Sequence, residues 1–223
     1  MNGIWILLLL ILIAALPAIA VFFWFRAKKF RVTLRWYLAA LAAGIISLSA
    51  AALAQNLFPV PGGEILAGLG QILFGVFVRV ALVEELCRLV FLAALFRAGS
   101  RRAEMEKPFC AALGLAAGLG FAVMENAFYG TADINIALLR AFTAAPLHGA
   151  CGIRAGAAAF LFAKDPARAV FLFISAVLIH AAYNLMIVIP FLPSALAVPV
   201  ALAAFFASLS FIKDGFTRRP SLG

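Results

Sequence analysis

The segment VALVEELCRLVFL, residues 80–92, places charged side chains inside an otherwise apolar run. It holds two adjacent glutamates, Glu84 and Glu85, and then an arginine, Arg88, about one helical turn further on. A charge at the centre of a lipid bilayer costs about 2.5 to 3.5 kcal/mol on insertion scales. Charges gathered this closely in an apolar segment therefore need a structural or functional reason.

The rest of the chain has the composition of a membrane protein. Of its 223 residues, 66% are hydrophobic and only 12% are charged, which is far from the balance in soluble domains. The apolar segments leave no room for a separate soluble domain, so we expect a single transmembrane domain over residues 1–223. We expect an all-α, polytopic helical bundle with about seven transmembrane helices, because a bilayer requires roughly 20 residues per span. The expected spans are 3–25, 36–57, 65–96, 108–129, 138–163, 168–189 and 194–212.

Basic residues gather on one side of these expected spans. Fourteen of the 18 Lys and Arg residues fall in segments 26–35, 97–107, 164–168 and 213–219, which follow the first, third, fifth and seventh spans. The opposite loops hold none (55–63, 130–137 and 190–193). The positive-inside rule then places the N-terminus outside and the C-terminus in the cytoplasm. These positions account for the net charge of +9 without a nucleic-acid partner, which is not expected.

Titratable residues from several spans are expected at similar depths in the bilayer. With a rise of 1.5 Å per residue, Glu84 lies roughly 12 Å from the outer surface, and His148 and His180 roughly 14 Å from it. Glu125 is shallower, at roughly 6 Å by the same estimate. Such an alignment is typical of a functional site, since unrelated polar contacts would be scattered through the bundle. The shorter path for water to this level runs from the outer side.

Local spacings bring several of these groups onto common helix faces. Glu84 and Arg88 are four positions apart, so the arginine can pair with one of the carboxylates. Adjacent side chains point roughly 100° apart on a helix, so Glu84 and Glu85 cannot face one point in the same way. His180 and Asn184 also share a face and present an imidazole and an amide together.

The remaining intramembrane residues are given structural interpretations. We expect Arg79 and Arg154 to act as charge partners or to extend toward the cytoplasm, and Arg154 to lie below the carboxylates with Arg88. The role of Arg140, near the outer end of the fifth span, is left open. The pairs Gly114/Gly118 and Gly152/Gly156 predict that the fourth and fifth spans approach their neighbours closely.

If these residues form a site that breaks peptide bonds within the membrane, the sequence excludes several mechanisms for that reaction. Neither histidine begins an HExxH zinc motif, because His148 reads HGAC and His180 reads HAAY. No serine stands in a GxSG context, and every aspartate falls in a loop or at an interface, so neither a serine nor an aspartyl mechanism is expected. What remains is a water activated by a glutamate, with imidazole and amide groups to stabilise the oxyanion.

Four short segments together resemble the PrsW family of bacterial intramembrane proteases. They are EELCR (84–88), GFAVMENAFY (120–129), R-x7-HGACG (140–152) and HAAYN (180–184), and the resemblance covers about residues 80–190. That family is grouped with the CAAX-prenyl proteases and their bacterial relatives, a glutamate-dependent group once described as metalloproteases. Its pattern of EExxK/R, FxxxE or FxxxH, and HxxxN falls on these segments, with arginine in the first motif where lysine is usual. Spans 3–25, 36–57 and 194–212 would then be accessory to this core.

The resemblance implies a set of site residues and a class of substrate. The expected catalytic residues are Glu84, Glu85, Glu125, His148 and His180, and the residues expected to position the oxyanion or the substrate are Asn184 and Arg88. Within this set, Glu84 is expected to be the general base. We expect no cofactor; zinc held by the same glutamates and histidines is the alternative. The implied substrate is a single-pass membrane protein, such as a membrane-anchored anti-sigma factor, in a bacterial cytoplasmic membrane.

Two other classes of function are alternatives to proteolysis. Chains of Glu, His and Arg across helices also build ion pathways, so a proton- or ion-coupled transporter is one alternative. The sequence shows no evident internal repeat of the kind that many transporters contain. A non-catalytic scaffold that binds a partner helix through its glycine faces is the other, but it leaves the common depth of the polar groups unexplained.

Overall fold

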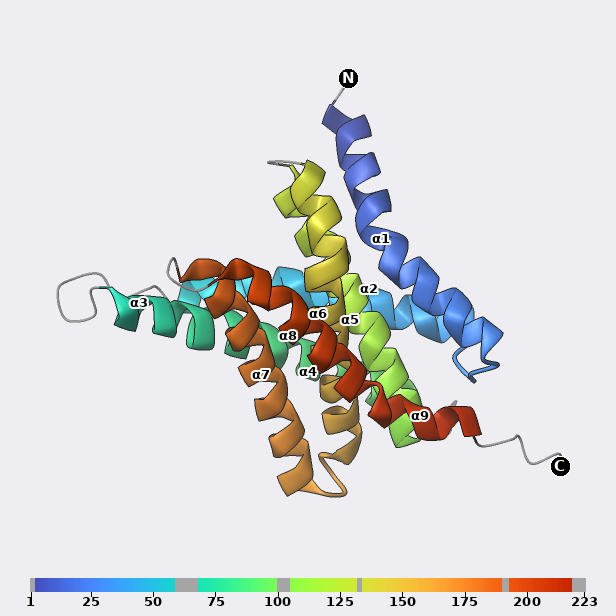
Figure 1. The fold of residues 1–223 in the computed structure, drawn as a ribbon. Coiled ribbons are helices and arrows are strands. Elements are labelled where there is room, and N and C mark those ends of the chain that lie inside the picture. The colour runs from blue at the N-terminus through green and yellow to red at the C-terminus, as the bar shows by residue number, and fades with distance from the viewer. Residues whose placement is uncertain (1–2, 59–67, 100–104, 132–133, 190–192, 218–223) are drawn as a thin grey trace, which may run out of the picture.

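The chain folds as a bundle of helices, shown in Figure 1. The computed structural model describes residues 3–58, 68–99, 105–131, 134–189 and 193–217, and every regular element within those ranges is a helix. The elements are α1 (Gly3–Ala27), α2 (Leu34–Ala54), η1 (Gln55–Leu57), α3 (Leu69–Leu73), η3 (Phe74–Leu82), α4 (Val83–Gly99), α5 (Lys107–Gly130), α6 (Ile134–Leu161), α7 (Pro166–Val188), η4 (Ser194–Leu196), α8 (Ala197–Ser208) and α9 (Ser210–Thr217). The expected all-α class is confirmed for these residues.

Five helical segments in the described ranges are long and apolar enough to cross a membrane. They are Leu8–Ala27, Leu34–Leu57, Lys107–Gly130, Pro166–Val188 and Ser194–Lys213, which match the expected first, second, fourth, sixth and seventh spans. The expected third and fifth spans are also long helices, but they are less apolar because they carry many of the site's polar residues. The expectation of an integral membrane protein is therefore confirmed, while seven crossings and their orientation stay a prediction.

Large apolar side chains on the outside of the bundle agree with a lipid environment. Leu53 is 73% exposed, Phe142 74% and Phe171 69%, and they lie on three different helices. Soluble monomers rarely expose such apolar surface over wide areas. In a bilayer the same side chains face acyl chains, so no further partner is needed to explain them.

Helix α5 is the centre of the bundle, and α6 packs directly against its backbone. A Cβ atom added at Gly114 would lie 2.1 Å from the carbonyl oxygen of Gly152, and one added at Gly118 would lie 2.0 Å from that of His148. Only glycine allows two backbones to approach so closely. The predicted close packing through these glycines is confirmed, and it brings the first half of α5 against the second half of α6.

The third long helix is continuous from residue 69 to residue 99 and changes its winding along the way. Its middle part, η3, is a π-helix, and it ends directly before the glutamates at the start of α4. π-helical turns are rare and occur frequently at functional sites, because the wider turn changes the direction of the side chains that follow. In Figure 1, α3 projects at one edge of the molecule.

Some of the sequence expectations concern residues that the structure does not describe. These are residues 65–67 of the expected third span, parts of the expected outer loops (59–63, 132–133 and 190–192), and four of the basic residues counted for the orientation, namely Arg101, Arg102, Arg218 and Arg219.

Candidate active site

The charged residues of the opening segment are buried at the start of α4. Glu84 is 6% exposed, Glu85 0% and Arg88 1%. Arg88 forms an ion pair with Oε1 of Glu85, three positions before it, so the expected pairing of the arginine with one of the two carboxylates is present. A buried charge is tolerated when it is paired and hydrogen-bonded, and this pair supplies both conditions for Glu85.

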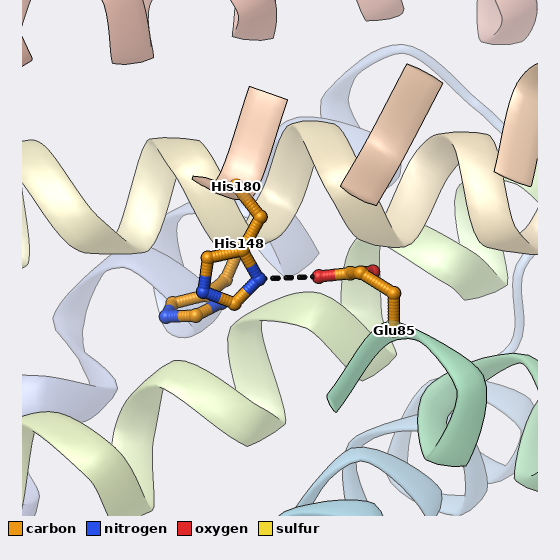
Figure 2. Close-up of side chains that lie close together, drawn as sticks. All are labelled: Glu85, His148 and His180. Carbon is orange, nitrogen blue, oxygen red and sulfur yellow. Dashed lines mark hydrogen bonds and ion pairs between the residues drawn. The ribbon is translucent and has the colours of Figure 1, made fainter. Parts of the chain in front are cut away.

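One imidazole from α7 contacts both adjacent glutamates. Nδ1 of His180 lies 2.8 Å from Oε1 of Glu85, the contact drawn as a dashed line in Figure 2. On the other edge of the ring, Nε2 lies 3.6 Å from Oε2 of Glu84, which is beyond hydrogen-bonding distance. The two nitrogens face different directions, so two side chains that diverge on α4 can both reach this ring.

Arg88 also connects the cluster to α6. Its Nη2 atom lies 3.3 Å from Nδ1 of His148, and its guanidinium lies over the ring of Phe121, 4.4 Å from the centroid. A guanidinium can only donate, so Nδ1 of His148 is the acceptor and the ring proton is on Nε2. That Nε2 atom lies 2.7 Å from Oε2 of Glu125, to which it donates. Both nitrogens of His148 are therefore engaged.

Glu125 forms the last ion pair of the cluster, with Arg140. Nη2 of Arg140 donates to Oε2 of Glu125 at 2.7 Å, and its Nε donates to Oδ1 of Asn126 at 2.9 Å. The guanidinium also lies 4.0 Å from the centroid of the Tyr129 ring. Arg140, whose role the sequence left open, is thus an ion-pair partner of a predicted site residue.

The contacts form an unbroken series across α4, α5, α6 and α7. In order, the series runs through Glu84, His180, Glu85, Arg88, His148, Glu125 and Arg140. Acidic and basic groups nearly alternate along it, so the buried carboxylates lie beside fixed positive charge. Oε2 of Glu84 and Oε2 of Glu85 are buried and have no hydrogen-bond partner among the described residues. The series therefore ends at Glu84, whose Oε2 atom has no hydrogen-bond partner among the described residues.

The expected difference in depth between Glu125 and His148 stays a prediction; their side chains are hydrogen-bonded, and α5 and α6 cross one another in Figure 1. Two other sequence expectations need correction. Arg154 forms no ion pair with the carboxylates among the described residues and donates instead to Oγ of Ser175 and Oγ of Ser208. Arg79 has no carboxylate partner among the described residues and donates instead to the backbone oxygen of Gln55 at 3.2 Å.

Asn184 is the one expected site residue that stands apart from the cluster. It lies one turn beyond His180 on α7 and is partly exposed. Within the part of the chain that the structure describes, no hydrogen bond joins it to the carboxylates or imidazoles. The structure therefore brings together the other six expected residues and leaves Asn184 beside them.

Gln55 belongs to the site and was not found from the sequence. Its Nε2 atom lies 3.1 Å from Oε1 of Glu84. The residue is uncharged and lies at the end of the expected second span, so neither charge nor a motif drew attention to it. The only available signal was an amide at the end of an apolar segment, which is common at membrane interfaces.

Glu85, His148 and His180 could together hold a metal ion. Each offers one ligand atom, these atoms lie within 4.8 Å of one another, and all three side chains are buried. Two imidazoles and a carboxylate are a known ligand set for catalytic zinc, so the donor types fit. The same donors already contact Arg88, which pairs with Glu85 and lies 3.3 Å from Nδ1 of His148. A cation bound there would have to share them with a fixed positive charge.

Comparison with known proteins identifies the family. No curated protein and no solved structure matches the chain. The family model of PrsW family intramembrane metalloproteases matches residues 32–210. The match is wider than the segment 80–190 that the motifs indicated, since it includes α2, with the site's Gln55 at its end, and α8. The chain belongs to the PrsW family of intramembrane proteases, and it is a hydrolase that acts on peptide bonds within the membrane.

Proposed function

We propose that this protein is a glutamate-dependent intramembrane endopeptidase in which Glu84 is the general base. The observation that carries the proposal is the free oxygen of Glu84: Oε2 is buried, has no hydrogen-bond partner among the described residues, and lies 3.6 Å from Nε2 of His180. At this distance the two atoms are not hydrogen-bonded to each other, so Oε2 keeps its full capacity to accept a hydrogen bond from a water molecule. Glu85 and Glu125 are less suited to the role, because positively charged or hydrogen-bonding groups already hold them.

In the proposed reaction, Oε2 of Glu84 accepts a proton from water as the water oxygen bonds to the scissile carbonyl carbon. The carbonyl oxygen becomes an oxyanion, which a hydrogen bond from the side-chain amide of Asn184 would stabilise, joined by one from Nε2 of His180 when both nitrogens of that ring are protonated. When the intermediate collapses, the carbon–nitrogen bond breaks and Glu84 returns the proton to the leaving amine. The products are a carboxylic acid and an amine, and the glutamate is regenerated.

The other members of the cluster are proposed to hold this arrangement in place. Glu85 accepts from Nδ1 of His180 and so orients the ring toward Glu84, while Arg88 pairs with Glu85 and keeps it fixed. His148 and Glu125 join α6 to α5 on the opposite side of Arg88. Catalysis of this kind depends on groups that are already oriented before the substrate arrives.

A metal-dependent form of the same activity is the second candidate. The family's description and the donor set of Glu85, His148 and His180 support it. Zinc bound by these residues would polarise the substrate carbonyl and make its bound water more acidic. We favour the metal-free form because both nitrogens of His148 are engaged, by Arg88 and by Glu125, and Glu85 is engaged by Arg88 and by His180.

The substrate is proposed to be a single-pass membrane protein, such as a membrane-anchored anti-sigma factor, in a bacterial cytoplasmic membrane. The buried site and the apolar outer surface support a substrate that enters from the bilayer. The motifs on α4, α5 and α7 resemble those of the PrsW family, which is grouped with the CAAX-prenyl proteases, and that resemblance implies a regulator of this kind as the substrate.

The proposed function is tested with purified protein in proteoliposomes that contain single-pass peptides carrying a fluorophore and a quencher. The wild-type protein is expected to cleave at least one peptide of the set, and Glu84→Gln to cleave it at least about 100-fold more slowly, since a general base contributes 10²- to 10⁴-fold. Glu106→Gln, outside the cluster at the start of α5, is the matched control. A wild-type rate in Glu84→Gln would end the assignment, and proton uptake without cleavage would favour a transporter.

A further inference from the structure

The end of α2 reaches the proposed base through a side chain that lies outside the motif segments. Nε2 of Gln55, in η1, lies 3.1 Å from Oε1 of Glu84. A carboxylate only accepts hydrogen bonds, so the amide nitrogen of Gln55 is the donor. Hydrogen bonds to an ionised acceptor are stronger than neutral ones, and a glutamine in this position therefore holds one oxygen of the carboxylate.

Gln55 is itself held by the helix that carries Glu84. Nε of Arg79, on η3, donates to the backbone oxygen of Gln55 at 3.2 Å. Arg79 and Glu84 belong to one continuous helix, so Gln55 is attached to that helix at two points, by its backbone through Arg79 and by its side chain through Glu84. Two attachments restrict where the amide can lie relative to the carboxylate.

The consequence for Glu84 is that its two oxygens are different. Oε1 accepts from Gln55, and Oε2 has no partner and faces His180. The terminal torsion of a glutamate is broad, so a carboxylate without a fixed donor would sample many orientations about that bond. A donor on one oxygen removes this freedom and leaves the other oxygen aimed at the place where water would be activated.

We infer that Gln55 is a positioning residue, which fixes the Glu84 carboxylate with Oε2 toward His180, and that Arg79 holds Gln55 in place for this purpose. The inference rests on the proposed function, in which Glu84 is the base. Gln55, which follows α2, and Arg79, on η3, would then both contribute indirectly to the reaction. Gln55 acts through Glu84 and is not required to touch the substrate.

The test compares three variants in the proteoliposome assay, with the peptide that the wild-type protein cleaves. Gln55→Leu removes the donor, Gln55→Glu keeps the shape but offers only acceptors beside Glu84, and Asn56→Leu alters the exposed neighbouring residue as the matched control. Loss of a hydrogen bond to a charged group predicts that Gln55→Leu lowers kcat roughly 10-fold or more. Gln55→Glu is expected to lower kcat further, because it adds like charge. KM should stay unchanged in both, and Asn56→Leu should match wild type.

Arg79 provides a second measurement that does not depend on the fold of the Gln55 variants. Arg79→Lys keeps a donor and is expected to retain more kcat than Arg79→Met, while KM is again unchanged. A merely structural role predicts a different pattern, in which Gln55→Glu resembles Gln55→Leu and thermal unfolding falls in step with activity. That pattern, or kcat within about two-fold of wild type in Gln55→Leu and Arg79→Met, overturns the inference.

The same experiment separates failure of this inference from failure of the proposed function. If Glu84→Gln is inactive and the Gln55 and Arg79 variants are unaffected, Glu84 remains the base and Gln55 does not position it. If Glu84→Gln cleaves at the wild-type rate, the proposed base is wrong and the inference falls with it.

Discussion

Nδ1 of His180 lies 2.8 Å from Oε1 of Glu85, and this contact joins α7 to α4 inside the bundle. The same carboxylate oxygen accepts from Arg88, so one atom of Glu85 links the motif helix, the histidine and the arginine. Burying a charged group is unfavourable unless its partners are supplied with good geometry. Glu85 therefore holds α4 and α7 together, in addition to any part that it has in the reaction.

The buried pair of Glu85 and Arg88 predicts a strong asymmetry between single and double variants. Arg88→Leu leaves a buried carboxylate without its charge partner, and removal of one partner of such a pair costs about 3–5 kcal/mol. Glu85→Leu/Arg88→Leu removes both charges and should recover much of that loss, although it should not recover cleavage. The measurement is reversible unfolding in detergent.

Arg168→Leu supplies the control for this comparison, since Arg168 is exposed on α7 and its side chain has no hydrogen bond or ion pair within the described ranges. Its unfolding free energy should change by no more than about 0.5 kcal/mol. A double variant that is as unstable as the sum of the single variants would contradict the proposed coupling between Glu85 and Arg88.

The fold was largely predictable because the bilayer restricts what an apolar sequence can form. Apolar segments of about 20 residues must be helices, so the helix positions followed from hydrophobicity alone. The glycine pairs then predicted that the fourth and fifth spans approach their neighbours closely, and the close approach of Gly114 to Gly152 confirms that prediction. The π-helix of η3 was not predicted, since no periodicity in an apolar segment distinguishes it from an α-helix.

The members of the site were predictable to the extent that they carry charge or belong to a motif. Glu84 and His180 were selected because ionisable groups are rare in a membrane. Gln55 was missed because it is neutral, and Arg154 was misplaced because spacing along one helix does not say which neighbouring hydroxyl groups are within reach. The hydrogen bond between Glu125 and His148 was not predicted, since positions along single helices do not say which side chains of crossing helices meet.

Close packing of α5 on α6 predicts that Gly118→Ala will disturb the site by displacing α6. The added Cβ would lie 2.0 Å from the carbonyl oxygen of His148, so α6 must move away from α5. Overpacking of this kind typically costs about 1–3 kcal/mol, and the shift would also separate His148 from Glu125. We expect lower thermal stability and a clear loss of cleavage.

Gly75→Ala is the matched control for the glycine experiment, because a Cβ at Gly75 meets nothing within 4 Å. Alanine is favoured over glycine in helices, so this variant should be at least as stable as wild type. Equal behaviour of the two variants would show that the contact at Gly118 does not constrain α6.

The engagement of His148 on both nitrogens predicts that activity does not require a metal. Protein purified without affinity tags that bind metals should contain far less than one zinc per chain, and cleavage should survive 1,10-phenanthroline. His148→Gln should impair cleavage through loss of its contacts with Arg88 and Glu125, with no accompanying change in metal content. Stoichiometric zinc, with activity lost to the chelator and restored by added zinc, would instead establish the metal-dependent form.

The distribution of basic residues predicts that the site opens toward the non-cytoplasmic side. Tyr129 is 51% exposed near the C-terminal end of α5, next to Arg140. Lys29 lies in the basic connection between α1 and α2. In a variant without the native cysteines, Tyr129→Cys should react with an impermeant maleimide added outside intact cells. Lys29→Cys should react only after the cytoplasmic face is exposed, because the positive-inside rule places it there. The reverse pattern would invert the topology, and the prediction that water reaches the site from the outer side would then be wrong.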